Sequence, residues 1–273
     1  MTKPVKPELS LLGIYAHPDD EAFGAGGALA RYAARGARVQ LVCATRGEAG
    51  KLTDPELGEV KDIAALRQAE LERACEILGL LPPIFLGYHD SGRGDRLRRD
   101  DERALINADP ERLERELLRH IKEAKPQVML TFDPHGIYGH PDHLVIHRAA
   151  TAAFWSAGGV MQPAPRRLFY NVLKAETMRA MQAQRGPSPL SDLDPDLYGV
   201  SADSLAAVLE VDEVLEQKGA AIRAHRSQVG PQSSFAGMPG ELWTEMLRLE
   251  TFSLGGLRGG FPEGPVDDLF VGL

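Results

Sequence analysis

Two short stretches of the chain combine histidine with carboxylates where a strand is expected to give way to a helix. Residues 16–21 read Ala-His-Pro-Asp-Asp-Glu after the apolar run 11–15, and residues 140–143 read His-Pro-Asp-His after the strand-like run 127–132. In a parallel sheet such turns share one rim, beyond the carboxyl ends of the strands, where ligands bind. Imidazole and carboxylate suit a catalytic zinc ion, which takes three protein ligands and keeps one position for water. The two turns therefore predict a metal-dependent active site.

Helix capping is the alternative interpretation of each turn taken alone. Asp19, Asp20 and Glu21 suit a first helical turn, where carboxylates accept hydrogen bonds from free N–H groups and face the positive end of the helix dipole. Pro18 suits the same position. Capping does not require a histidine in both turns, so the repeated pattern favours a metal site.

Spacing alone leaves the metal ligand of the second turn open. His143 and His147 are four residues apart on an expected helix and face the same way. Either imidazole satisfies the pattern, and His147 is also an ordinary helix position.

The chain resembles the LmbE-like, or PIG-L, family of zinc-dependent N-deacetylases. The two turns match the two signature motifs of that family, and the resemblance continues through residues 45–48, 66–71, 90–92 and 218–228. The closing Asp-Asp-Leu-Phe at 267–270 is similar to the branch that deacetylates N-acetylglucosaminyl-inositol in mycothiol biosynthesis.

The resemblance implies a metal site made of His17, Asp20 and His143. The implied ion is zinc, with ferrous iron as the alternative that fits the same ligands. His147 then has a supporting or structural role. Asp19 is implied to be the general base that accepts a proton from water, since a carboxylate beside the ligands suits that work.

The second turn and its preceding loop supply the other catalytic candidates. The resemblance implies that a protonated His140 stabilises the oxyanion or protonates the leaving amine, and that the Asp142 carboxylate holds that imidazole. Tyr138 lies between glycines and resembles a mobile tyrosine that approaches the oxyanion. A packed surface aromatic is the alternative for Tyr138, and a first-turn helix carboxylate is the alternative for Asp142.

Three further charged residues match family positions that hold the sugar. Arg67 and Asp90 resemble residues that bind sugar hydroxyls, and Glu48 is a weaker match. Solvated salt bridges are the alternative for Arg67 and Asp90. His225 and Gln228 are expected only at the rim of the site.

Strand and helix patterns alternate along the chain and predict an α/β fold with a Rossmann-like, mostly parallel sheet and helices on both faces. Residues 1–175 are expected to form the catalytic core with both metal motifs, and residues 176–273 a C-terminal extension with a lid and tail, packed on the same domain. The Pro-, Asp- and Ser-rich stretch 183–201 is the expected insertion or lid. The expected strands are 10–15, 39–44, 84–86, 127–132 and 167–172, and the expected helices are 22–35, 62–78, 111–124, 143–157 and 212–224.

Composition argues against several classes of partner. The 273-residue chain has a net charge of −8, which disfavours nucleic acid and anionic membranes, and no apolar run approaches the ~18–20 residues of a membrane helix. The N-terminus lacks the apolar core of a signal peptide. Cys43 and Cys75 form no Cys-x-x-Cys pair, which predicts buried free thiols in a reducing cytoplasm.

These observations predict a cytoplasmic, metal-dependent hydrolase that removes the acetyl group from an N-acetylglucosamine unit of a small glycoside, as in the biosynthesis of low-molecular-weight thiols. An amidase that cleaves mycothiol-like S-conjugates, or a non-catalytic relative that binds sugar or zinc, are the alternatives. Binding alone needs neither Asp19 nor His140, which argues against the non-catalytic relative. The expected partner is a small N-acetylated glycoside, without nucleic acid or membrane insertion, and a homo-oligomer remains open.

Overall fold

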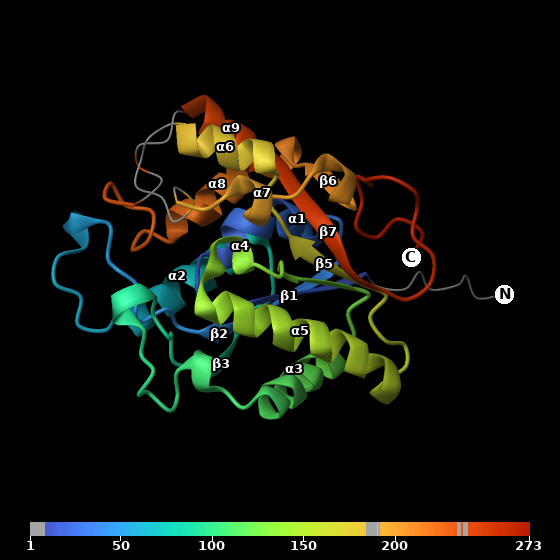
Figure 1. The fold of residues 1–273 in the computed structure, drawn as a ribbon, viewed down its shortest axis with the longest axis horizontal. Coiled ribbons are helices and arrows are strands. Elements are labelled where there is room, and N and C mark those ends of the chain that lie inside the picture. Colours follow the sequence, from blue (N-terminus) through green and yellow to red (C-terminus); the bar gives the residue numbers. More distant parts are fainter. Residues whose placement is uncertain (1–8, 184–189, 191, 234–235, 237–239) are drawn as a thin grey trace.

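A mostly parallel β-sheet forms the centre of the molecule, as predicted (Figure 1). The computed structural model describes residues 9–183, 190, 192–233, 236 and 240–273. In these residues the sheet has seven strands in the order β3-β2-β1-β4-β5-β7-β6. The first five in this order are parallel, and β7 runs antiparallel to both β5 and β6. The strands are β1 (Ser10–Tyr15), β2 (Arg38–Thr45), β3 (Ile84–Tyr88), β4 (Val128–Phe132), β5 (Arg167–Asn171), β6 (Ala207–Glu210) and β7 (Leu249–Leu257).

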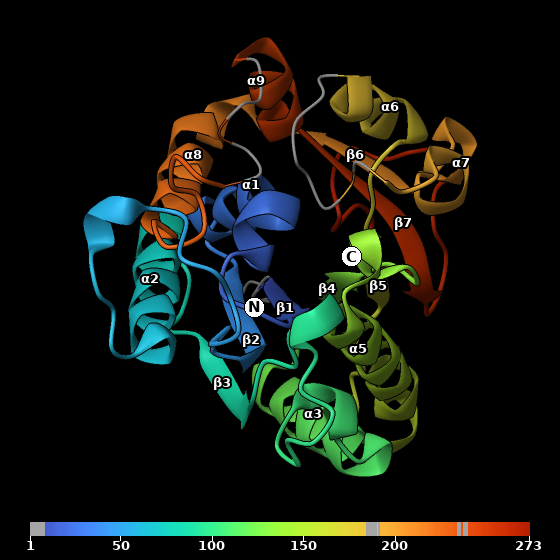
Figure 2. The same ribbon diagram turned by 60° about the vertical axis from the view of Figure 1, so that its left-hand side comes forward.

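Helices cover both faces of this sheet (Figures 1 and 2). One group packs together as α1 (Asp20–Ala34), α2 (Ile63–Leu78) and α8 (Leu215–Ala224), and α3 (Pro110–Ala124) packs against α5 (Pro141–Val160) on the opposite face. The remaining helices are α4 (Gly136–Gly139), α6 (Ala175–Ala183), α7 (Pro195–Tyr198) and α9 (Gly240–Arg248). In the described residues no helix is both long and apolar enough to cross a membrane.

The hydrophobic pattern explains the two-sided cover of the sheet. Every residue of β1 is buried, as expected for a central parallel strand with helices on both faces. In α3 the buried Leu113, Leu117 and Ile121 recur at helical spacing on one face. Cys43 and Cys75 are both buried and free, as predicted.

The second motif begins its helix earlier than the sequence pattern indicated. The predicted helix 143–157 runs from Pro141 to Val160, because proline fits the first helical turn and the His140 ring caps it. The His140 Nδ1 atom accepts a hydrogen bond from the Asp142 amide at 3.2 Å. The site residues of this motif therefore stand on the first turn of α5.

The C-terminal segment contributes to the same sheet. Strand β7 pairs with β5, so strands from both sides of residue 175 belong to one sheet. The division into a core and a C-terminal extension at this residue stays a prediction. The tail docks as expected, since Leu269 and Phe270 are buried and the Leu269 amide donates to the Tyr32 hydroxyl at 2.7 Å. Part of the predicted lid, residues 184–189 and 191, lies outside the described residues.

Candidate metal and catalytic site

The two histidine-containing turns meet because their strands are neighbours. Strand β1 pairs in parallel with β4, so the turn from β1 into α1 and the loop from β4 into α5 leave the same end of the sheet. A cleft of about 700 Å³ opens there, and His17, Asp19, Asp20, Tyr138, His140, His143, Arg67 and Asp90 all line it. The structure thus brings eight of the ten predicted site residues to one cleft, and the other two, Asp142 and Glu48, contact lining residues His17 and Asp90.

Three side chains in this cleft bring their donor atoms together in a compact triangle, to which Asp20 contributes both carboxylate oxygens. His143 Nε2 lies 3.3 Å from His17 Nδ1 and 3.2 Å from Asp20 Oδ1, and His17 Nδ1 lies 3.4 Å from Asp20 Oδ2. Ligand atoms placed about 2.0–2.2 Å from a tetrahedral zinc ion are roughly 3.3–3.6 Å apart. The spacing and chemistry of the three donors therefore fit a divalent cation of this kind.

A second set of donors overlaps with the first. Imidazole nitrogens of His17, His140 and His143 all lie within 4.8 Å of one another. The His140 Nδ1 atom is already occupied by the Asp142 amide, whereas the Asp20 carboxylate contacts both other histidines. The triangle with Asp20 is the better ligand set, and His140 lies beside it.

The other ring nitrogen of His17 contacts carboxylates. His17 Nε2 lies 3.0 Å from Asp142 Oδ2 and 3.5 Å from Asp90 Oδ1, and the Ser91 amide donates to Asp142 Oδ2 at 2.9 Å. Burial opposes a charged His17, but the charge of Asp90 and hydrogen bonds to Asp142 and Asp20 raise its pKa well above the usual value. A carboxylate on the far nitrogen fixes the orientation of a metal-binding imidazole.

The position of Asp142 differs from the sequence-based expectation. Its carboxylate contacts His17, and its backbone amide rather than its side chain contacts His140. The reason is local: Pro141 starts the helix, so the Asp142 amide faces the capping His140 ring while the side chain turns across to the β1 turn.

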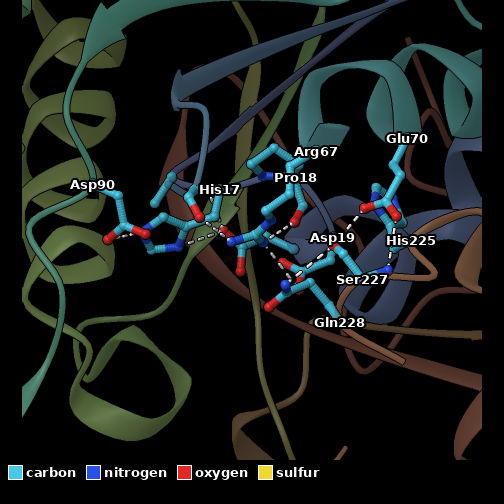
Figure 3. Close-up of polar contacts among 12 residues, drawn as sticks. His17, Pro18, Asp19, Arg67, Glu70, Asp90, His225, Ser227 and Gln228 are labelled. Atoms are coloured by element: carbon cyan, nitrogen blue, oxygen red, sulfur yellow. Dashed lines mark hydrogen bonds and ion pairs between the residues drawn. The ribbon is translucent and has the colours of Figure 1, made fainter. Parts of the chain in front are cut away.

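Asp19 lies next to the donor triangle in an unusual backbone conformation. Its φ of 117° is in the left-handed region, and its Oδ2 atom lies 3.3 Å from Arg67 Nη2 (Figure 3). Burial raises the pKa of Asp19 to about 6, against the opposing effect of the Arg67 charge. A carboxylate with that pKa can accept a proton near neutral pH.

The surroundings of His140 oppose the expected imidazolium. Burial, followed by the charges of His17 and His143, lowers the pKa of His140 to about 2. Because Nδ1 accepts the Asp142 amide, the neutral ring carries its proton on Nε2. His140 is therefore a neutral hydrogen-bond donor in this structure.

Tyr138 stands over the same group of rings. Its ring centroid lies 5.0 Å from that of His143 and 6.1 Å from that of His140, and the Arg93 guanidinium lies 5.1 Å from it on its face. Burial raises the pKa of Tyr138 well above the usual value, so its hydroxyl stays protonated. The preceding Ile137 has a φ of 63°, which is strained for a β-branched residue.

The predicted sugar-binding residues are buried and hold backbone groups. Arg67 donates to the carbonyls of Gly47, at 2.7 Å, and of Pro18. Asp90 Oδ2 accepts from the Ala49 amide at 3.2 Å, and Glu48 Oε1 accepts from the Asp90 amide at 3.1 Å. Figure 3 shows Asp90 beside His17, and Arg67 over the turn at Pro18 and Asp19.

Known proteins are similar to this chain over nearly its whole length. The model of a family described as PIG-L, GlcNAc-PI de-N-acetylase, matches residues 12–154, which include both histidine turns. The chain belongs to the PIG-L family. The 1D-myo-inositol 2-acetamido-2-deoxy-alpha-D-glucopyranoside deacetylase of Salinispora arenicola is 33% identical to this PIG-L chain, over 98% of the chain and 92% of the relative. The enzyme of the same name from Thermomonospora curvata is 34% identical over 96% of both chains.

Solved structures share the PIG-L fold. A conserved protein from Thermus thermophilus is 25% identical, with a TM-score of 0.58 over 94% of this chain and 99% of that chain. The N,N'-diacetylchitobiose deacetylase from Pyrococcus horikoshii is 21% identical, with a TM-score of 0.54 over 93% of this chain and 86% of that one, which shows a common fold. The comparisons confirm the predicted family and the predicted α/β class.

Two further polar residues of the PIG-L chain lie behind the site. His147 Nδ1 contacts the Phe132 carbonyl at 2.9 Å and its ring packs on Tyr170, so its side chain is used in packing. His225 is fully buried and its Nε2 atom lies 2.7 Å from Glu21 Oε1, deeper than the rim position expected. The sequence signal for His225 is its place in the family-like segment 218–228, whereas the pattern around Glu21 indicates only helix capping.

Proposed function

We propose that this PIG-L chain is a metal-dependent N-deacetylase of a small glycoside that contains N-acetylglucosamine. One observation carries the proposal: His17, Asp20 and His143 form a cation-sized triangle with Asp19 beside it in a substrate-sized cleft. The relatives support a 1D-myo-inositol aglycone, because they are named for that glycoside and align over nearly the whole chain.

The metal held by these three residues is proposed to be zinc, with ferrous iron as the alternative. When bound, such an ion polarises the acetyl carbonyl and lowers the pKa of water. Asp142, on the second nitrogen of His17, holds that ligand in orientation. The paired charges of this arrangement are buried, and burial strengthens the attraction between them compared with the same charges in water.

Asp19 and His140 are proposed to move protons during hydrolysis. Asp19, with its raised pKa, accepts a proton from the attacking water. The Nε2–H group of His140 donates a hydrogen bond to the carbonyl oxygen as negative charge develops there. The C–N bond then breaks, the nitrogen takes up the proton that Asp19 accepted, and free amine and acetate result. Tyr138 faces the same rings and is proposed to add a hydroxyl donor to the oxyanion.

The sugar is proposed to lie between Arg67 and Asp90, which both line the cleft. Arg67 uses two of its nitrogens on backbone carbonyls, and within the described chain its Nε atom is buried without a partner. Asp90 likewise holds the loop amides of Ala49 and Gly92. Both side chains are thus fixed before substrate binds, which reduces the entropic cost of binding. Glu48 is proposed to support Asp90 rather than to contact the sugar.

An amidase acting on S-conjugates is a second candidate, and one feature favours it. The lining of the cleft also contains apolar side chains, among them Phe23, Leu173, Met181, Met246 and Leu249. An inositol ring has no need of such side chains, whereas an apolar group linked through sulfur would bury surface against them.

The two candidates differ in the substrate that the protein prefers. Purified protein with stoichiometric zinc is given free N-acetylglucosamine, its inositol and malate glycosides, and a bimane-type thiol conjugate. The proposal predicts acetate release, with kcat/KM for a small glycoside at least about tenfold above that for free sugar, or roughly 1.4 kcal/mol. Preference for the conjugate would identify the amidase instead, and no turnover of any compound would favour a non-catalytic relative.

A further inference from the structure

The backbone of Asp19 adopts a conformation that the surrounding structure has to maintain. Its φ of 117° and ψ of −29° are unfavourable for a residue with a side chain, and such a conformation persists only where the surroundings enforce it. The Asp19 side chain makes no capping hydrogen bond to helix α1 that would compensate. Groups outside the residue must therefore hold this turn.

Glu21 holds the amide of Asp19 from within the protein. Its Oε2 atom accepts from the Asp19 amide at 3.1 Å, and its side chain is buried. The other oxygen, Oε1, lies 2.7 Å from Nε2 of His225, which is also fully buried at the end of α8. One carboxylate thus connects the C-terminal half of the chain to the backbone of the proposed general base.

We propose that His225 and Glu21 are positioning residues for Asp19. This inference rests on the deacetylase activity proposed above. His225 fixes the Glu21 carboxylate, and Glu21 fixes the Asp19 amide, so that the Asp19 carboxylate stays in the cleft beside the metal ligands. Neither residue touches the substrate, and neither binds the metal.

Two other contacts show that His225 is not needed to attach its own segment. Glu70 accepts from both the amide and the hydroxyl of Ser227, at 2.7 and 2.6 Å, and so ties this segment to α2. Lys218 of α8 pairs with Glu250 at 2.8 Å, and Glu250 accepts from the amide of Gly27 in α1 at 2.7 Å. The specific effect of the His225–Glu21 contact is therefore to hold the turn at Asp19.

The first test compares His225→Leu with His225→Gln and His225→Asn in the zinc-loaded full-length protein. Glutamine can place an N–H donor near the Nε2 position, whereas the shorter asparagine and the apolar leucine cannot. We expect kcat to fall at least about tenfold in the Leu and Asn variants, with KM and metal stoichiometry unchanged, and the Gln variant to recover most of it. Ser227→Ala is the matched control, because it removes an equally buried hydrogen bond of the same segment and should leave kcat unchanged.

A double variant separates positioning from general support of the fold. If His225 acts through Asp19, His225→Leu causes no further loss of kcat in an Asp19→Asn background. If the kcat losses of the two single variants multiply in the double variant, the proposal is overturned. Equal kcat in the Gln, Asn and Leu variants of His225 would overturn it as well. If the Leu variant does not fold, the Gln and Asn variants give the same comparison.

Amide exchange tests the inference without turnover. Hydrogen–deuterium exchange of the 17–22 turn should speed up in His225→Asn but not in Ser227→Ala. Unchanged exchange there would contradict the proposal, even if the wild-type protein hydrolyses nothing. Wild-type protein that releases no acetate refutes the proposed function, whereas active wild type with normal His225 variants refutes only the positioning role.

Discussion

The Nε2 atom of His143 lies 3.3 Å from Nδ1 of His17, although 126 positions separate the two residues in sequence. The parallel pairing of β1 with β4 produces this contact, because it places the ends of both strands on one rim. Asp20 completes the group from the first turn of α1, within 3.2 Å of His143 and 3.4 Å of His17.

Metal content should depend on His17 and His143. Replacing either by alanine removes one of three donors, so each variant should lose stoichiometric metal in elemental analysis after dialysis. His147→Ala is the control on the same helix and should keep its metal, because the His147 ring packs against Tyr170. Retention in both test variants together with loss in His147→Ala would refute the ligand assignment.

Asp19 and His140 should affect turnover more than metal binding. Loss of a general acid or base typically costs ~10²–10⁴ in rate, so Asp19→Asn and His140→Ala should show kcat reduced by about that range. Both variants should remain folded and metal-loaded, as judged by circular dichroism and elemental analysis. Near-normal kcat at saturating metal would remove the residue concerned from the mechanism.

Asp142 should act on the metal site through His17. Its carboxylate contacts His17 Nε2 at 3.0 Å, and loss of such a partner typically weakens metal affinity about 10–100-fold. Competition with a chelator should show that loss in Asp142→Asn but not in His140→Ala. Unchanged metal affinity with reduced kcat in Asp142→Asn would instead support a role in holding His140.

The stability that His225 provides should decrease at alkaline pH. Burial opposes its charged form, but the Glu21 carboxylate outweighs this and raises the pKa of His225 above the usual 6.5. A histidine whose pKa is higher in the folded than in the unfolded protein contributes its full stabilisation below pH 6.5. This contribution is lost as the pH rises through the folded-state pKa. The difference in unfolding free energy between wild type and His225→Gln, from urea titrations, should thus be larger at pH 6 than at pH 9. A difference independent of pH would show that His225 is neutral in the folded protein.

The sequence predicted the parts of the site that lie in short local patterns. The two turns predicted a metal-dependent site, and the family resemblance selected His17, Asp20 and His143 as its ligands. Helical spacing located α1, α2, α3 and α5 to within a few residues. The contact of Asp142 with His17, by contrast, depends on how two distant turns face each other. No local pattern specifies that direction.

The C-terminal strands show a second limit of local patterns. The expected strands do not include β7, in which Gly255 and Gly256 lie. A side chain at either position would collide with the ring of Tyr170 or of Phe154. These glycines permit an aromatic packing that only the folded chain reveals.

The proposed deacetylase activity is best tested by release of acetate from 1D-myo-inositol 2-acetamido-2-deoxy-α-D-glucopyranoside. Wild-type protein is stripped with a chelator, reloaded with one equivalent of zinc, and assayed for both acetate and free amine. We expect equal amounts of the two products from the reloaded protein, and none from the stripped protein or from reloaded His17→Ala. Folded protein that holds stoichiometric zinc and yet releases neither product from this or any other N-acetylglucosaminide would contradict the proposed activity.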